Sequence, residues 1–181
     1  MVPGNTNNSR EPEEIWQVSF VGKTVVVGLG NPYMKDDGIG IFVARELAKN
    51  HSLGDKVLVY EYQAMDLYLL FQFKGAKKII LIDALKSGSP YGMVSKYEIT
   101  SKEGPLLKLP NLHELQLYDM LDIANATGLL VCPVVVIGVE PKDISPGEGL
   151  TDALAGSVSM ISMEVANEIN RNSGSLSGNS T

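Results

Sequence analysis

Apolar runs separated by turn-forming residues predict an alternation of strands and helices along the chain. Runs rich in β-branched residues predict five strands, at about residues 23–28, 56–62, 77–83, 93–99 and 131–139. Apolar positions at helical spacing predict four helices, at about residues 38–50, 65–73, 113–128 and 150–169. The strand at 77–83 is apolar throughout its middle, which indicates burial on both faces, as in a parallel sheet between helices. The pattern predicts an α/β fold, a three-layer α/β/α sandwich.

One strand of this sheet is expected to run against the others. Residues 84–92 (ALKSGSPYG) consist of turn-forming residues and connect the third strand to the fourth. Nine residues are too few for the crossover that a parallel neighbour requires. The strand at 93–99 is therefore predicted to be antiparallel.

The polar ends of the chain set the expected domain limits. Residues 1–21 are predicted to form a flexible N-terminal extension, because the first dozen are polar and rich in Pro and Asn. Residues 22–171 form a single α/β domain, and the low-complexity residues 172–181 form a disordered tail. Four apolar residues of the extension are candidates for docking on the domain: Ile15, Trp16, Val18 and Phe20.

Composition excludes several classes of protein. The chain has 181 residues, 44% of them hydrophobic, which suffices for one sizeable core. The net charge of −6 provides no electrostatic footprint for a nucleic acid. The single cysteine, Cys132, lies in an apolar run and is interpreted as a core residue. The longest apolar run, 129–139, is about half of a membrane span, and no leader pattern opens the chain, so a cytoplasmic protein is expected.

The loop after the first predicted strand, GLGNPYMKDDGIG (28–40), contains unusual chemistry. It resembles a dinucleotide-binding turn, but Tyr33 stands where the third glycine belongs, and two carboxylates nearby would repel a pyrophosphate. Acidic residues also stabilise helix amino termini. That role explains one carboxylate of the Asp36–Asp37 pair better than it explains both.

Two further polar residues flank the same predicted sheet edge. Asp83 ends the third strand, and His113 opens the helix after the fourth. If the first and third strands are neighbours, their loops flank the usual crevice for a ligand. Asp37, Asp83 and His113 would then form an oxygen and nitrogen ligand set suited to nickel or zinc. The alternative is structural: a loop cap for Asp83 and a solvated helix start for His113.

The chain lacks the motifs of two common hydrolase classes. It contains neither His-Glu-x-x-His, which zinc peptidases use, nor Gly-x-Ser-x-Gly, which serine hydrolases use. Any hydrolysis would therefore depend on other residues.

Four motifs resemble the hydrogenase maturation proteases, which process the large subunit of nickel-iron hydrogenases. They are GLGNPYMKDDGIG (28–40), IDA (82–84), the His113-Glu-Leu helix start, and IGVEPKDISPGEGLT (137–151). Together they span most of residues 25–165, in the order and spacing of that family. The resemblance implies an endopeptidase that removes the C-terminal extension of the large-subunit precursor after nickel insertion.

The resemblance also implies the sheet and the site. The family has five strands in the order 2-1-3-5-4 with strand 4 antiparallel. Its proposed metal ligands correspond to Asp37, Asp83 and His113, and Asp37 is also the candidate catalytic base, with Asp36 as a second candidate. Nickel would be supplied by the substrate, and other divalent ions could occupy the site. Some relatives carry glutamate where Asp37 stands. Residues 61–70 also differ from the family pattern, because some relatives have a small turn after the second strand.

Two rival interpretations remain at this point. Peptidyl-tRNA hydrolases also follow their first strand with Gly-Leu-Gly-Asn-Pro, but YMKDDGIG (33–40) lacks their catalytic histidine and asparagine, and the acidic balance disfavours tRNA. The second rival is a metal- or partner-recognition module that keeps the pocket but does not cleave. No nucleic-acid or membrane partner is expected under the favoured interpretation.

Overall fold

Five strands form one mixed sheet in the computed structural model, which describes residues 19–50, 53–99, 121, 123–124, 126–128 and 132–171. Their bounds are β1 Thr24–Leu29, β2 Val57–Tyr62, β3 Lys78–Ala84, β4 Val94–Ile99 and β5 Val134–Val139. Their order is β2-β1-β3-β5-β4. The four strands from β2 to β5 in that order are parallel, and β4 is antiparallel to β5. The predicted order and the reversed strand are confirmed.

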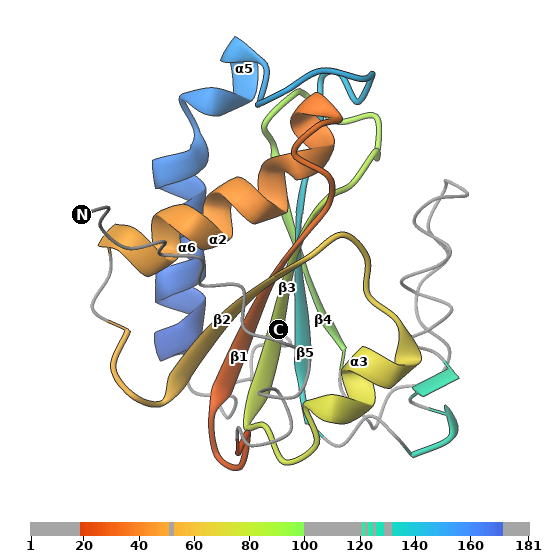
Figure 1. The fold of residues 1–181 in the computed structure, drawn as a ribbon, viewed down its shortest axis with the longest axis vertical. Helices are drawn as coiled ribbons and strands as arrows, with labels where there is room; N and C mark the ends of the chain where they lie inside the picture. The colour runs from red at the N-terminus through yellow and green to blue at the C-terminus, as the bar shows by residue number, and fades with distance from the viewer. Residues whose placement is uncertain are drawn as a thin grey trace, which may run out of the picture.

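Helices cover both faces of the sheet (Figure 1). The described helices are η1 Lys35–Gly38 (a 3-10 helix), α2 Ile39–Asn50, α3 Leu67–Gln72, α5 Asp152–Ala155 and α6 Val158–Asn170. Helices α2 and α6 contact each other on one face, and α3 lies on the opposite face. The predicted helix 113–128 lies mostly outside the described residues. None of the described helices combines the length and apolarity that a membrane crossing requires.

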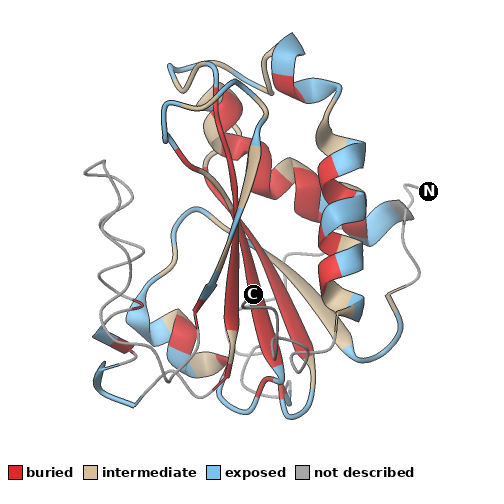
Figure 2. Ribbon diagram, turned by 180° about the vertical axis from the view of Figure 1, so that it is seen from behind, coloured by how far each residue is buried: buried red, intermediate tan, exposed pale blue. Residues whose placement is uncertain are grey.

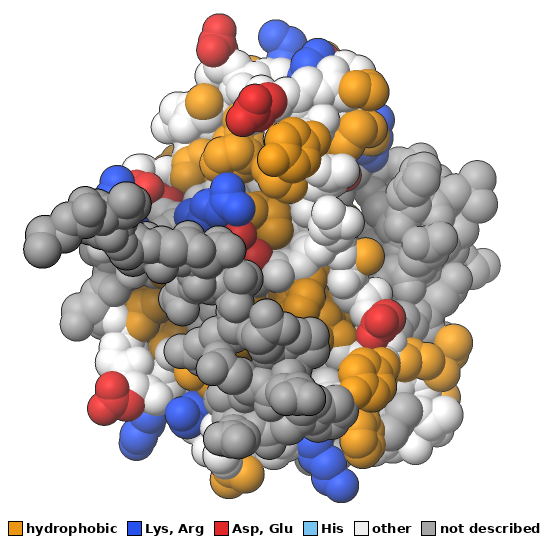
Figure 3. Space-filling model, in the orientation of Figure 1, with side chains coloured by type: hydrophobic (Ala, Val, Ile, Leu, Met, Phe, Trp, Pro, Cys, Tyr) orange, Lys and Arg blue, Asp and Glu red, His pale blue; other side chains and the backbone are white. Residues whose placement is uncertain are grey.

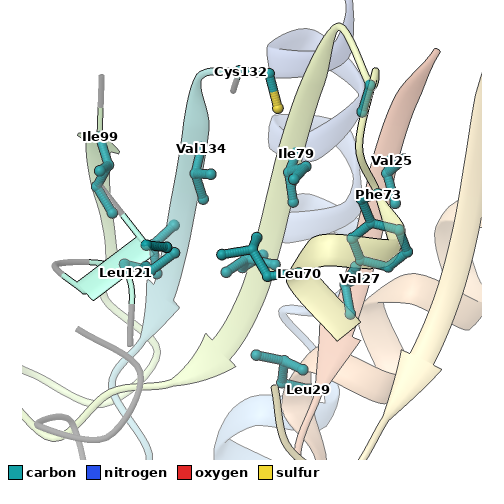
Figure 4. Packing of buried hydrophobic residues seen from close by; sticks show 14 of the residues in the cluster. Val25, Val27, Leu29, Leu70, Phe73, Ile79, Ile99, Leu121, Cys132 and Val134 are labelled. Carbon is teal, nitrogen blue, oxygen red and sulfur yellow. The ribbon is translucent and has the colours of Figure 1, made fainter. Parts of the chain in front are cut away.

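Alternate residues of the buried strands supply two hydrophobic cores. Figure 2 shows that the central strands are buried along most of their length. On the α3 face, Leu70 and Phe73 pack with strand residues such as Val27 and Ile79 (Figure 4). The strand residues that alternate with these point to the opposite face and pack against α2 and α6. The second core is formed by Val26, Ile39, Val43, Leu47, Ile80, Ile82, Val135, Ile137, Val139, Leu154, Ile161 and Val165. Burial on both faces explains why these strands are apolar throughout their middles.

Phe20 and Cys132 both belong to the core on the α3 face. The Phe20 ring meets that of Phe73 edge-on, with centroids 5.2 Å apart, which confirms that Phe20 docks on the domain. Burial raises the pKa of the Cys132 thiol to about 11, so its interpretation as an unreactive core residue is also confirmed. The other docking candidates and the tail 172–181 lie outside the described residues.

The last predicted helix is two helices, which corrects the sequence-based interpretation. Apolar spacing continues through residues 150–169, but α5 ends at Ala155 and α6 begins at Val158. At Ser157 both the backbone N–H and the hydroxyl donate to the carbonyl oxygen of Leu154, three residues back. The backbone bond spans three residues, as in a 3-10 turn, and replaces the bond spanning four residues that would continue an α-helix. Gly156, a weak helix former, precedes it.

The start of α2 lies directly against the carboxyl ends of two strands. A Cβ at Gly40 would lie 2.2 Å from the carbonyl oxygen of Ile82 and 2.4 Å from that of Leu29. Only glycine permits so close an approach between backbones. The approach fixes the amino end of α2, and the loop before it, over β1 and β3.

Candidate functional site

Three loops meet at the carboxyl edge of the sheet, at the top of Figure 1. The first joins β1 to α2 and contains Asp37. The second follows β3, whose penultimate residue is Asp83. The third, residues 140–151, leads from β5 to α5. This edge is where α/β proteins commonly bind ligands.

The first loop folds tightly around Asp37. Gly30 has φ +115°, and a Cβ there would lie 1.8 Å from the backbone oxygen of Asp37. Across this contact, the backbone N–H of Asn31 donates to Oδ2 of Asp37 at 2.8 Å. The loop therefore holds the half-buried Asp37 side chain by one oxygen, and among the described residues no hydrogen bond is made to its Oδ1. Gly30 therefore allows the loop to close tightly around Asp37.

Asp83 lies on the neighbouring strand at the same edge. Strands β1 and β3 are paired up to Gly28 and Ile82, one residue before Asp83, and η1 contacts β3. Oδ1 of Asp83 accepts a hydrogen bond from the backbone N–H of Ala84 at 2.8 Å. The structure thus brings Asp37, in the loop after β1, and Asp83, on the neighbouring strand β3, to one edge of the sheet.

The third predicted ligand, His113, lies outside the described residues. Within the described part of the chain, no three His, Cys, Asp or Glu side chains are grouped so as to hold a metal ion. The assignment of Asp37, Asp83 and His113 as metal ligands stays a prediction. The two described members supply carboxylate oxygens, which are suitable ligands for a divalent ion.

The Asp36 carboxylate accepts hydrogen bonds from the third loop, whereas the sequence suggested that it caps α2. Its side chain is fully buried and accepts four hydrogen bonds from the third loop. Oδ2 accepts from the backbone N–H groups of Lys142 and Asp143 and from the Thr151 hydroxyl, and Oδ1 accepts from the Thr151 N–H. Asp36 and Asp37, although adjacent, therefore have different partners.

Lys35 provides a second connection between the first and third loops. Its Nζ donates to Asp143 at 2.5 Å and to Ser145 at 2.8 Å, and its N–H donates to the Gly147 carbonyl at 3.0 Å. The hydrogen bonds from Lys35 and Ser145 hold the pKa of Asp143 far below its usual range. Lys35 has φ +46°, a conformation that costs a non-glycine residue free energy and is found at functional sites.

Glu140, at the start of the third loop, fixes the loop that follows Asp83. Its buried carboxylate accepts hydrogen bonds from the N–H and hydroxyl of Ser87, both at 2.7 Å, and from the Gly88 N–H at 3.2 Å. Burial raises the pKa of Glu140, but the hydrogen bonds from Ser87, Gly88 and Ser89 lower it by more, so the net shift is downward. Its ionised form therefore stabilises the fold.

This stabilisation is expected to disappear in acid. The folded-state pKa of Glu140 lies below the unfolded value of about 4.3. Its contribution is present above that value and is lost as pH falls through the folded-state pKa. Urea unfolding between about pH 7 and pH 3 should show a shallower loss of stability for Glu140→Gln than for wild type. The exposed Glu148→Gln should keep the wild-type slope, and an unchanged slope in Glu140→Gln would contradict the assignment.

Exposed apolar side chains belong to the loops at this edge. Tyr33, in the first loop, is 67% exposed, and Tyr91 and Met93, in the loop after β3, are 64% and 46% exposed. In Figure 3 hydrophobic side chains gather on the upper part of the molecule, over the end that carries these loops. Apolar surface of this kind suits contact with another protein.

Sequence reasoning did not identify the partners of Asp36 or the role of Glu140. Glu140 carries the same signal as Asp83, an acidic residue at the end of a buried strand. The partners of Asp36 are 106 to 115 residues away, so no local pattern identifies them.

Comparison with known proteins identifies the family. The family model described as hydrogenase maturation protease (HycI) matches residues 41–168, most of the chain. The hydrogenase expression/formation protein HupD of Rhodobacter capsulatus is 26% identical over 149 residues, covering 81% of this chain and 71% of its own. The hydrogenase 2 maturation protease of Escherichia coli is 27% identical over 133 residues, covering 71% and 79%.

Solved structures agree in fold. The hydrogenase maturating endopeptidase HybD from E. coli aligns with a TM-score of 0.70 at 23% identity, covering 82% of this chain and 92% of its own. A HycI protease from Thermococcus kodakarensis aligns with a TM-score of 0.63 at 21% identity, covering 88% and 98%. The sheet order and the extent of the family match lead to one conclusion: the chain belongs to the hydrogenase maturation protease family.

Proposed function

We propose that this protein is the cytoplasmic endopeptidase that removes the C-terminal extension of a nickel-iron hydrogenase large-subunit precursor once nickel has been inserted. The observation that supports this most is the placement of Asp37, in the turn after β1, and Asp83, near the end of the neighbouring strand β3, at one sheet edge in a chain of this family. The names of the relatives refer to hydrogenase expression and formation in one case and to hydrogenase maturation in the other. The family assignment also favours a protease over a peptidyl-tRNA hydrolase.

In this proposal the metal belongs to the substrate. Asp37, Asp83 and His113 contact the nickel held by the precursor, so that only a loaded large subunit is positioned for cleavage. Carboxylate oxygens and an imidazole nitrogen are ligands that nickel accepts. Recognition of the metal by the protease would couple cleavage to completed nickel insertion.

Asp37 is proposed as the general base of the hydrolysis. One of its oxygens is held by the Asn31 N–H. The other, to which no described residue donates a hydrogen bond, would accept a proton from water. The water oxygen then forms a bond to the scissile carbonyl carbon, the carbon–nitrogen bond breaks, and the leaving amine takes up a proton. The exposed Tyr33, Tyr91 and Met93 lie on loops of the same edge and are suited to contact the precursor around the cleavage point.

A processing assay tests the proposal. The purified chain is mixed with precursor prepared with and without nickel, and the mass of the large subunit is measured. A mass loss equal to the extension, only with nickel present, supports the protease. Binding of the loaded precursor without a mass change would support the recognition module instead.

A further inference from the structure

The Asp36 carboxylate has a structural arrangement that the proposed chemistry does not use. It is 0% exposed, and its four hydrogen bonds, 2.8 to 3.1 Å long, come from both ends of the third loop. Lys142 and Asp143 lie just after β5, and Thr151 lies directly before α5. One side chain, that of the residue before Asp37, thus holds the two ends of a loop whose residues between these ends are half-buried or exposed.

All four groups around Asp36 are donors. Three are backbone N–H groups. The fourth is the Thr151 hydroxyl, which donates to Oδ2 of Asp36 at 3.0 Å. A carboxylate is the side chain that accepts from all of them. Asparagine has the same shape but would direct an NH2 group at one or more of these donors, leaving buried groups unpaired.

The position of Asp37 depends on that of Asp36, because the two residues are adjacent in one short turn. Both residues belong to the single turn η1, where the Asp37 N–H donates to the Met34 carbonyl at 3.1 Å. On the other side the Asp37 backbone is in contact with Gly30. A shift of Asp36 therefore moves Asp37 relative to Asn31, whose N–H holds its Oδ2.

We propose that Asp36 is a positioning residue: anchored by Thr151 and by the N–H groups at 142 and 143, it holds Asp37 in the orientation needed at the sheet edge. Because its side chain is fully buried, Asp36 acts through Asp37. The kinetic part of this inference rests on the proposed function, whereas the positioning of Asp37 is measurable without it.

Two variants and a control test the proposal in the full-length protein. Asp36→Asn alters all four hydrogen bonds, and Thr151→Val removes only the hydroxyl donor while keeping the N–H. Ile161→Val, on the buried face of α6, is the control for general loss of stability. For each, kcat and KM are measured on nickel-loaded precursor below its unfolding temperature. Exchange of the Asn31 amide hydrogen is followed by NMR.

Asp36→Asn is expected to lower kcat about tenfold or more with little change in KM, because misplacing a reacting group by about 1 Å has effects of this size or larger. Thr151→Val should lower kcat less. In both, the Asn31 amide should exchange faster than in Ile161→Val. A folded Asp36→Asn with wild-type kcat, or with Asn31 exchange no faster than the control, would overturn the proposal.

Failure of the proposed function has a different signature. If wild type cleaves no precursor, the protease assignment is wrong. The exchange rate of the Asn31 amide hydrogen then decides alone whether Asp36 positions Asp37. Faster exchange in Asp36→Asn then supports the claim, and unchanged exchange refutes it.

Discussion

Replacing Asp37 with asparagine is expected to lower the rate of precursor cleavage by at least about a hundredfold, the usual contribution of a positioned general base. Asparagine keeps the size of the side chain and an oxygen that can accept from the Asn31 N–H. It lacks the negative charge and the proton-accepting oxygen. The first loop should therefore keep its fold while the chemistry is lost.

The measurement is the rate of mass loss of nickel-loaded precursor at saturating substrate. Asp37→Glu keeps the carboxylate and is expected to retain far more activity than the asparagine variant. Asp152→Asn, an exposed carboxylate at the start of α5, should cleave at the wild-type rate. Undiminished cleavage by Asp37→Asn would remove Asp37 from the catalytic role.

Much of this site was predictable from local patterns in the sequence. Asp83 follows an apolar strand, and Asp37 follows a strand and a glycine turn, so a parallel sheet brings both to one edge. The short connection 84–92 likewise gave the reversal of β4. Each of these inferences uses residues that are close in the sequence and geometry that every parallel sheet shares.

The features that the sequence did not reveal depend on distant partners. The buried role of Asp36 becomes evident only when the third loop lies against η1. The break at Gly156 depends on Ser157 bonding to Leu154, which apolar spacing does not encode. From the sequence, Lys78 is an ordinary polar residue at the start of a strand. In the structure its side chain is buried, because it forms an ion pair with Glu168 of α6.

Replacing Lys78 with methionine is expected to reduce the free energy of unfolding by about 3–5 kcal/mol, as when one partner of a buried ion pair is removed. Lys78 Nζ donates to Oε1 of Glu168 at 2.9 Å, and both side chains are almost fully buried. It also donates to the backbone carbonyls of Glu168 and Arg171, at 2.7 and 2.9 Å. Methionine leaves these three acceptors without that donor.

Glu168 itself offers an internal control. Its other oxygen accepts from Lys96 at 3.0 Å, but the Lys96 side chain is 39% exposed. Lys96→Met should therefore cost no more than about 1 kcal/mol, as is usual for exposed pairs. Urea unfolding at neutral pH measures both variants. Equal losses would show that burial does not set the strength of this interaction.

The double variant Lys78→Met/Glu168→Leu separates the lost attraction from the cost of an unpaired buried charge. Burial raises the pKa of Glu168, and hydrogen bonds from Lys78 and Lys96 lower it by more, so the carboxylate stays ionised in the folded protein. Lys78→Met alone leaves this charge without its closest buried partner. Replacing both residues removes the charge together with its partner, and apolar replacements of buried pairs are often neutral or stabilising. We therefore expect the double variant to be more stable than Lys78→Met. A further loss of stability would instead show that Glu168 stabilises the fold without Lys78, through partners such as Lys96.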